Sequence, residues 1–337
     1  TKWRLIAAPP RLEPPRPLAQ RMLPEFVDAL GGGVFAIDTG FTRPRFDAAY
    51  LIVQDGRAAF VDSGTNFSVP RLLTALDAVG IARDAVDWVI PTHVHLDHAG
   101  GVGLLMQSLD NACVLVHERG VRHMVDPRAL FEGALAVYGA QEMQRSYGEL
   151  QPIDANRVRA THEGMVVELA GRPLRFADTP GHARHHHCIW DEHTRGWFTG
   201  DTFGLSYREY DTAGGAWITP TTTPVQFEPD SLRQSIDRLV ARDPQCMYLT
   251  HYSRVRDIPR LASLLHEQIN ALVALAEPLR GHPARHRALC EQLRAFYRAQ
   301  LSRHGVADVE AGVQALALDT ELNAQGLEVW LDRVRRG

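Results

Sequence analysis

The sequence predicts an α/β fold followed by a helical C-terminal region, and three observations support this prediction. Residues 33–118 alternate short β-prone segments with amphipathic helical segments, which is the pattern of an α/β sandwich. Strand-like segments return in residues 165–251. From residue 259 onward the chain consists of amphipathic helical segments with almost no strand signal. We therefore expect a layered α/β domain and a separate group of helices.

The individual elements follow one another in a regular order. The first strands are "GVFAIDTG", "AAYLIVQ" and "RAAFVDSG", and the dipeptide Asp55-Gly56 predicts a hairpin turn between the last two. Helical spacing of apolar residues marks "VPRLLTALDAVGI", in which Gly80 predicts the end of the helix. The next elements are the strand "AVDWVIPT", the helix "GGVGLLMQSL" and the strand "ACVLVHE". The later strands are "MVVELAG", "PLRFADTPGH", "HHCIWDE", "GWFTGD" and, after the helix "SLRQSIDRLVARD", "CMYLTH".

The expected organisation has three parts. A proline-rich N-terminal arm (1–32) precedes the sandwich domain (33–258), and a helical region (259–337) follows it. Within the sandwich, residues 119–150 interrupt the alternation with a partly apolar helical insertion, which is either a lid over a site or a packed insertion. The C-terminal helices are structural, form one wall of a pocket, or make a homodimer contact.

The composition excludes several classes of protein. Charged residues make up 23% of the chain and the net charge is -4, so no basic field is present for nucleic acid or an anionic membrane. No apolar run approaches the ~20 residues that span a bilayer, and the N-terminal segment lacks the apolar core of a signal peptide. The four cysteines are far apart and form no CxxC pair. We expect a cytoplasmic protein with reduced cysteines that acts on a small molecule.

Four potential metal ligands follow the strand "VDWVI" within six residues. The string "THVHLDHAGG" contains His93, His95, Asp97 and His98. Burying four such polar groups at one strand end would lower stability unless they had partners. A metal ion supplies that partner, because imidazole nitrogen and carboxylate oxygen suit zinc, iron or manganese. The motif therefore predicts a metal site.

Three later strands each end in one more candidate ligand. "DTPGH" ends in His182, "FTGD" ends in Asp201, and "YLTH" ends in His251. Each ligand follows an apolar strand, so all three can meet the first motif at one edge of an α/β sheet although they are far apart in sequence.

These motifs resemble those of the metallo-β-lactamase superfamily. The matching strings are "FVDSG", "THVHLDHAGG", "TPGH", "FTGD" and "LTH", in this order, and they extend over about residues 33–255. The resemblance implies an αββα sandwich with two metal ions in a cleft between its sheets. We therefore expect this architecture, with the predicted C-terminal helices as an extension of it.

The resemblance also implies a role for each candidate residue. The first ion would be held by His93, His95 and His182, and the second by Asp97, His98 and His251. Asp201 would bridge the two ions. Asp97 and Asp201 are also the residues expected to act in catalysis. Asp62 and His186 would support the ligands from behind. Zinc is the ion we expect first, and iron or manganese is compatible with the same set.

Two divalent ions at such a set suggest a hydrolase. Ions about 3.5–4 Å apart can share a water and hold it as hydroxide near neutral pH, so no serine or cysteine nucleophile is needed. We expect hydrolysis of an activated acyl bond in a thioester, ester or lactone. Two alternatives stay open: a low-turnover metal-binding sensor or effector of the same fold, and a mononuclear-iron enzyme similar to persulfide dioxygenases.

Departures from related families narrow this expectation. Class B β-lactamases lack an aspartate bridge at the position of Asp201, so β-lactams are not the expected main substrate. Acyl-homoserine lactonases carry a tyrosine where this chain has Gly204. Glyoxalase II is similar in its helical C-terminal extension, but its last metal histidine lies in a Gly-His-Glu string, and here the string is "LTHYS".

An aromatic cluster follows Asp201. Its members are Phe203, Tyr207, Tyr210 and Trp217. The cluster is either ordinary loop packing or a hydrophobic wall for an acyl or aryl group, and the two interpretations are about equally supported because the loop begins at a metal-ligand candidate. These four residues are our substrate-binding candidates.

Overall fold

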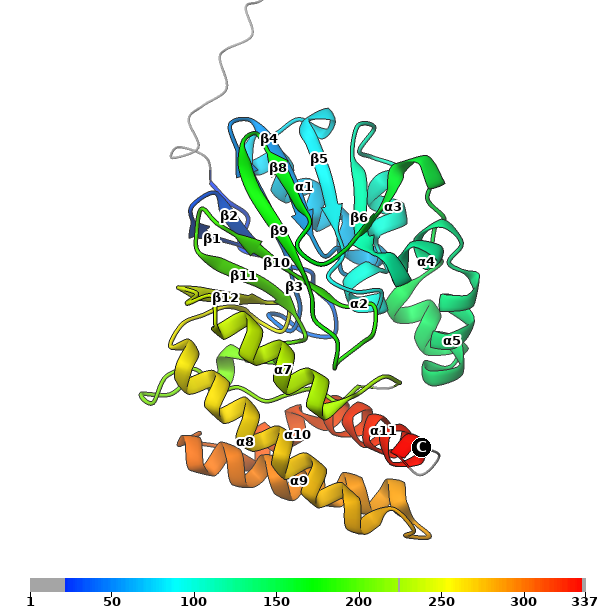
Figure 1. The fold of residues 1–337 in the computed structure, drawn as a ribbon, viewed down its shortest axis with the longest axis vertical. Coiled ribbons are helices and arrows are strands. Elements are labelled where there is room, and N and C mark those ends of the chain that lie inside the picture. Colours follow the sequence, from blue (N-terminus) through cyan, green and yellow to red (C-terminus); the bar gives the residue numbers. More distant parts are fainter. Residues whose placement is uncertain (1–21, 224, 335–337) are drawn as a thin grey trace, which may run out of the picture.

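The computed structural model describes residues 22–223 and 225–334, so residues 1–21 of the expected N-terminal arm lie outside the described residues. Two β-sheets pack face to face at the centre of the molecule, and helices cover their outer faces (Figure 1). The interface between the sheets is apolar and includes an aromatic group: Tyr50 of one sheet packs edge-on against Phe198 and Tyr248 of the other at ring distances of 5.2 and 5.7 Å. The predicted αββα sandwich is confirmed.

The first sheet contains seven strands in chain order. They are β1 (Val27–Gly31), β2 (Val34–Asp38), β3 (Ala48–Gln54), β4 (Arg57–Val61), β5 (Val86–Ile90), β6 (Cys113–His117) and β7 (Val158–Thr161). Strands β1 to β4 pair antiparallel and β4 to β7 pair parallel. The predicted hairpin joins β3 to β4, with positive φ at Asp55 (45°) and Gly56 (78°), as a two-residue turn of this kind requires.

The second sheet contains six strands, and their spatial order is β13-β12-β11-β10-β9-β8. Their bounds are β8 (Val166–Leu169), β9 (Arg172–Asp178), β10 (His187–Asp191), β11 (Gly196–Gly200), β12 (Cys246–Leu249) and β13 (Ser253–Val255). Strands β11 and β12 are parallel and the other pairs are antiparallel. Three short strands, β1, β7 and β13, were not expected from the sequence. The last part of the expected arm is the edge strand β1.

Helices cover both sheets on their outer faces. Helices α1 (Val69–Val79), α2 (Leu96–Ala99) and α3 (Val102–Met106) cover the first sheet, and α7 (Pro229–Val240) and α8 (Ile258–Ala276) cover the second. Helix α1 ends at Gly80 with a left-handed φ of 77°, as predicted. Short 3-10 turns occur at Asn66–Ser68, Arg83–Ala85, Glu118–Gly120, Ala155–Arg157, Arg208–Tyr210 and Glu277–Leu279.

The insertion is helical, as expected. It contains α4 (Val121–Val125), α5 (Arg128–Tyr138), α6 (Ala140–Glu142) and a π-helical turn at Met143–Tyr147. Met143 and Tyr147 pack with Leu96 of α2, which lies within the first ligand motif. The insertion is therefore anchored directly on the loop that carries the predicted metal ligands.

The C-terminal region contains α8, α9 (Arg285–His304), α10 (Val309–Ala315) and α11 (Ala317–Val334). These helices share one apolar core with the second sheet, in which Leu272, Leu293 and Leu327 are fully buried. Figure 1 shows them stacked beyond α7, on the outer side of that sheet. Within the described residues, none of the helices has the length and apolar character required to cross a bilayer.

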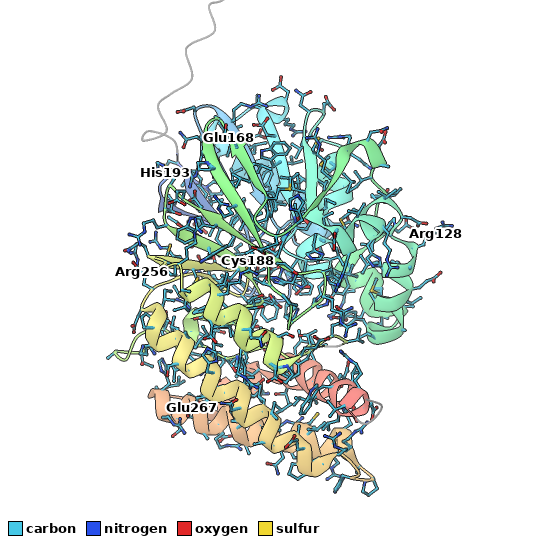
Figure 2. The ribbon with its side chains drawn as sticks, in the orientation of Figure 1. Arg128, Glu168, Cys188, His193, Arg256 and Glu267 are labelled. Atoms are coloured by element: carbon cyan, nitrogen blue, oxygen red, sulfur yellow. The ribbon has the colours of Figure 1, made fainter. Side chains whose placement is uncertain are left out.

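The four cysteines are unpaired, as expected. Cys188 of β10 lies inside the molecule, whereas charged residues such as Arg128 and Glu267 extend from its periphery (Figure 2).

Candidate metal centre

The ends of four strands deliver the predicted ligands to one place. The loop after β5 carries the first motif, and single residues follow β9, β11 and β12. The ligand atoms form three overlapping groups, each within 4.8 Å, which are His93, His95 and His182; His93, His98 and Asp201; and Asp97, His98 and His251. The structure thus brings all seven candidate ligands together.

The first group consists of three histidine nitrogens. Nδ1 of His95 lies 2.8 Å from Nε2 of His93 and 3.1 Å from Nε2 of His182. Burial lowers the pKa of His95 to about 3 and that of His182 to about 4, so both rings are neutral at pH 7. Neutral imidazoles have a free lone pair for a metal ion.

The second group combines one carboxylate with two histidines. Oδ2 of Asp97 lies 3.5 Å from Nε2 of His251 and 3.7 Å from Nε2 of His98. Burial disfavours a proton on His251, but the carboxylates of Asp201 and Asp97 outweigh it and raise its pKa to about 9. The acidic groups therefore stabilise a positive charge at this position, which a proton or a metal cation supplies.

Asp201 lies between the two groups. Its Oδ2 is 3.5 Å from Nε2 of His182, and its Oδ1 is 3.2 Å from Nε2 of His98 and 3.7 Å from Nε2 of His251. Both His98 Nε2 and Asp201 Oδ1 are buried and, among the described residues, neither has a hydrogen-bond partner. Buried polar atoms without a partner are costly. A cation between these atoms would satisfy both, so the residues fit a metal centre.

Asp62 supports His98 from behind. Its Oδ2 accepts a hydrogen bond from Nδ1 of His98 at 2.8 Å and another from Oγ1 of Thr250 at 2.8 Å. Its Oδ1 accepts from the backbone N–H of Thr92 at 2.7 Å. Because Nδ1 of His98 donates to Asp62, Nε2, which faces Asp201, is the nitrogen left to bind a cation.

Two further contacts orient the cluster in the same way. Nδ1 of His251 donates to the carbonyl oxygen of Phe46 at 3.0 Å, which leaves Nε2 free to face Asp97. His186 accepts the backbone N–H of Asp201 on Nε2 at 3.2 Å. His186 therefore lies behind Asp201, its ring stacks on that of His93 at 4.8 Å, and it belongs to none of the three ligand groups.

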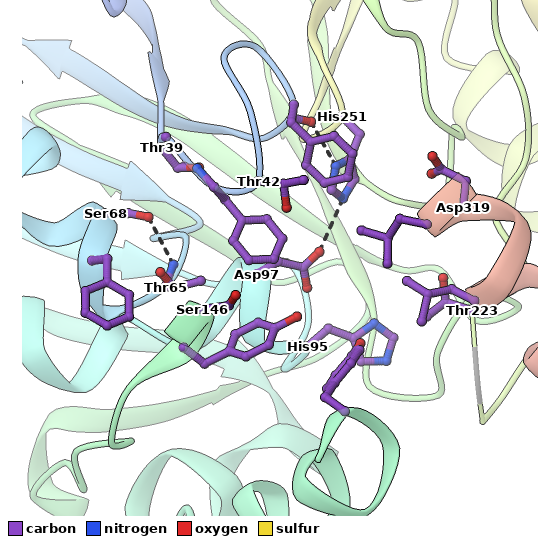
Figure 3. A pocket seen from close by; sticks show the side chains of 18 of the residues that line it. Thr39, Thr42, Thr65, Ser68, His95, Asp97, Ser146, Thr223, His251 and Asp319 are labelled. Carbon is purple, nitrogen blue, oxygen red and sulfur yellow. Dashed lines mark hydrogen bonds and ion pairs between the residues drawn. The ribbon is translucent and has the colours of Figure 1, made fainter. Parts of the chain in front are cut away.

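A cavity of about 800 Å³ lies over this cluster and is lined by His95, Asp97, Asp201 and His251. Its aromatic and aliphatic lining residues are Phe41, Phe46, Phe67, Tyr138, Tyr147, Leu205, Tyr207, Leu318 and Leu322. Figure 3 shows His95, Asp97 and His251 at this cavity, with Asp319 and Thr223 at its border. The walls come from residues 39–46 and 65–71, the insertion, the loop after β11 and α11.

The structure describes all four residues of the aromatic cluster, and among them Tyr207 alone lines this cavity. Its ring stacks on Phe46 at 5.2 Å, and its hydroxyl donates to Oδ1 of Asp319 at 3.0 Å. The other members, Phe203, Tyr210 and Trp217, are buried in the core shared with the C-terminal helices. They fill space there because the loop packs against α8 to α11.

Sequence reasoning did not identify most of the cavity wall. Tyr138 and Tyr147 belong to the insertion, and Leu318 and Leu322 belong to α11. The insertion and the C-terminal helices were each considered as a cover or wall, but no local motif marks which of their residues face the cavity. The π-helical turn that carries Tyr147 is the kind of irregularity that often marks a functional site, but sequence patterns do not show it.

Comparison with known proteins agrees with this geometry. The family model of the metallo-beta-lactamase superfamily matches residues 42–251. The metallo-beta-lactamase fold-containing protein ST1585 of Sulfurisphaera tokodaii is 26% identical over 224 residues, which cover 65% of this chain and 78% of that protein. A hydroxyacylglutathione hydrolase of Acidiphilium cryptum is 29% identical over 245 residues, or 70% of this chain and 79% of the relative.

The similarity extends to solved structures. A metallo-beta-lactamase family protein of Thermus thermophilus, TTHA1429, superimposes with a TM-score of 0.64 at 20% identity, covering 91% of this chain and 95% of that one. This likeness includes part of the C-terminal helical region, because it extends beyond the residues that the family model matches. The chain therefore belongs to the metallo-beta-lactamase superfamily.

Proposed function

We propose that this chain is a binuclear metal-dependent hydrolase that cleaves an activated acyl bond in a thioester, ester or lactone. The observation that carries the proposal is the position of the ligand cluster, which lies at one side of a cavity of about 800 Å³ whose lining combines aromatic and aliphatic side chains with polar and charged ones. Such a cavity suits an apolar acyl group beside a reactive polar centre.

The ligand set divides into two coordination sites that share Asp201. The first ion would be held by His93, His95 and His182, and the second by Asp97, His98 and His251. When bound, two divalent ions lower the pKa of a water and polarise a carbonyl oxygen. Zinc suits this nitrogen and oxygen set, and iron or manganese is an alternative.

The chain's own residues position the substrate and exclude water. Phe41, Phe46 and Tyr207 form an aromatic wall next to His251, against which an acyl chain or ring can pack. Tyr138 and Tyr147 approach from the insertion, with ring centroids 5.3 Å apart. Burial raises the pKa of both phenols and the Asp97 carboxylate adds to this, so both keep a proton that can be donated to a substrate oxygen.

The charges in the cavity favour an acyl substrate over a phosphate. Both arginines that line it already have a carboxylate partner: Arg71 lies 3.3 Å from Asp38, and Arg145 lies 2.6 Å from Glu142. A phosphodiester would have to compete with these ion pairs for its cations. The hydroxyacylglutathione hydrolase among the relatives also supports hydrolysis of an acyl group.

Side-by-side kinetics on one metal-loaded preparation test the proposal. We expect kcat/KM for an acyl thioester or lactone to exceed that for bis-p-nitrophenyl phosphate and nitrocefin by at least about tenfold, a transition-state difference of about 1.4 kcal/mol. Faster cleavage of either of those two compounds than of every thioester, ester and lactone tried would overturn the acyl-hydrolase assignment. Full metal occupancy without turnover on any of them would favour a metal-binding sensor.

A further inference from the structure

A second group of potential metal ligands lies in the C-terminal helices, outside the catalytic cavity. His286 and Cys290 are one turn apart on α9, and Glu321 faces them from α11. We propose that these three residues form a separate site for a borderline divalent cation such as zinc, here named the α9–α11 site. The proposal is independent of the hydrolase assignment, because it shares no residue with the catalytic cluster.

The spacing of the three ligand atoms matches the edges of a zinc tetrahedron. For zinc bonded at about 2.0–2.2 Å to nitrogen or oxygen and about 2.3 Å to sulfur, tetrahedral angles place nitrogen and oxygen roughly 3.3 Å apart and sulfur roughly 3.6 Å from each. Nε2 of His286 lies 3.2 Å from Oε2 of Glu321 and 3.6 Å from Sγ of Cys290, and the sulfur lies 3.8 Å from that oxygen. The three atoms can therefore hold an ion with little rearrangement.

A second layer of contacts orients these ligands. Nδ1 of His286 donates to Oε2 of Glu328 at 2.9 Å, which directs Nε2 toward Cys290. The amide of Gln325 donates to Oε1 of Glu321 at 2.8 Å. Metal-binding histidines commonly donate their other ring nitrogen to a carboxylate in this way.

Exposure gives a cation access to the site. The side chains of His286 and Glu321 are 40% and 48% exposed, whereas Cys290 is buried beneath them. The ion would thus enter from solvent, reach the sulfur last, and keep a fourth position for water. Burial raises the pKa of the Cys290 thiol, so a bound cation is needed to hold it as thiolate at neutral pH.

The position of the site connects it to the cavity wall. Glu321 lies on the same turn of α11 as Leu318 and Leu322, which line the catalytic cavity. An ion that joins α9 to α11 at Glu321 would hold this turn in place. The α9–α11 site would therefore be a structural clamp on one wall of the substrate pocket.

Cobalt titration of the metal-stripped chain tests the proposal through an absorbance signal that does not depend on activity. A cysteine thiolate bound to Co²⁺ gives a near-ultraviolet charge-transfer band, and none of the proposed ligands of the catalytic cluster is a cysteine. We expect the band in the wild-type chain. The variant Cys290→Ser should lose the band and should bind one cobalt ion fewer per chain. The control variant Cys113→Ser, which changes a half-buried cysteine of β6, should keep the band.

Two results would overturn the proposal and leave these residues as an ion-pair cluster only. One is the absence of a thiolate band in the wild type at saturating cobalt, and the other is an unchanged band in Cys290→Ser. If Cys290→Ser does not fold, the variant His286→Gln tests the site instead. The side chain of His286 is partly exposed, so we expect this variant to fold. The cobalt concentration for half-maximal absorbance should then rise at least about tenfold, and an unchanged value contradicts the site.

Discussion

Asp62 accepts a hydrogen bond from Nδ1 of His98 at 2.8 Å, and both side chains are fully buried. This contact selects the tautomer of His98 whose lone pair is on Nε2, toward Asp201. Asp62 itself has a left-handed φ of 57°, a conformation that a non-glycine residue adopts at some cost. Four donor groups hold the Asp62 carboxylate in place: the backbone N–H and the hydroxyl of Thr92, the hydroxyl of Thr250 and Nδ1 of His98.

We predict that Asp62→Asn weakens metal binding more than it changes the chemistry. The amide has one acceptor oxygen, so it cannot accept from both Nδ1 of His98 and the backbone N–H of Thr92, and the contact that fixes the tautomer of His98 is weakened. Loss of such an outer partner typically lowers metal affinity or activity about 10- to 100-fold. Metal titrations and kcat/KM would be measured at low and high free metal. Excess metal should restore much of the activity, and activity that stays low at full occupancy would contradict the positioning role.

Asp201→Asn should have a larger effect. The amide keeps the shape of the side chain but removes the negative charge that lies between His98 and His182. We expect kcat/KM to fall by more than the roughly 100-fold upper range for outer partners, with the ion at the Asp97–His251 side lost first. The circular dichroism spectrum of the variant should match that of the wild-type chain. Near-normal turnover in this variant would remove the bridging role.

Metal removal should destabilise the chain reversibly. An ion that binds only the folded state adds about 2.7 kcal/mol of stability at a free concentration about 100 times its Kd. We expect a lower Tm after dialysis against a chelator and its recovery on addition of zinc. In the Cys290→Ser background, which lacks the α9–α11 site, metal analysis should find about two ions per chain. A maximum of one ion there would contradict the binuclear cluster.

The ligand cluster could be predicted because its information is local. Each candidate, such as His182 or His251, follows an apolar strand. The expected single sheet edge is in fact shared by two sheets, because β5 of the first sheet and β9, β11 and β12 of the second end beside the same cluster. The hairpin at Asp55-Gly56 and the helix end at Gly80 could be predicted for a similar reason, since each depends on the backbone freedom of one or two residues.

The cavity wall could not be predicted in the same way. Tyr138 and Leu322 are nearly 200 residues apart, and they line one cavity only because the insertion and α11 both pack beside the cluster. The aromatic loop illustrates the same limit: its composition suits either a core or a pocket. Tyr207 lines the cavity and Tyr210 does not, although both are buried in the same core. Helical packing, which has no local sequence signal, decides between them.

This difference between tyrosines provides a further prediction. Tyr138→Phe removes a hydroxyl from the cavity near Asp97, whereas Tyr210→Phe removes one that donates to the carbonyl of Gly312 at 3.0 Å inside the core. A neutral hydrogen bond contributes about 0.5–1.5 kcal/mol, so Tyr138→Phe should lower kcat/KM for an acyl substrate roughly 2- to 10-fold with little change in Tm.

The control, Tyr210→Phe, should show the opposite pattern, with a stability loss of about 1 kcal/mol and unchanged kcat/KM. Denaturant unfolding and steady-state kinetics on both variants would measure this contrast. A larger kinetic effect of Tyr210→Phe than of Tyr138→Phe would show that the substrate contacts the loop after β11 and not the insertion. That result would return Tyr210 to the substrate site and would leave the insertion as packing alone.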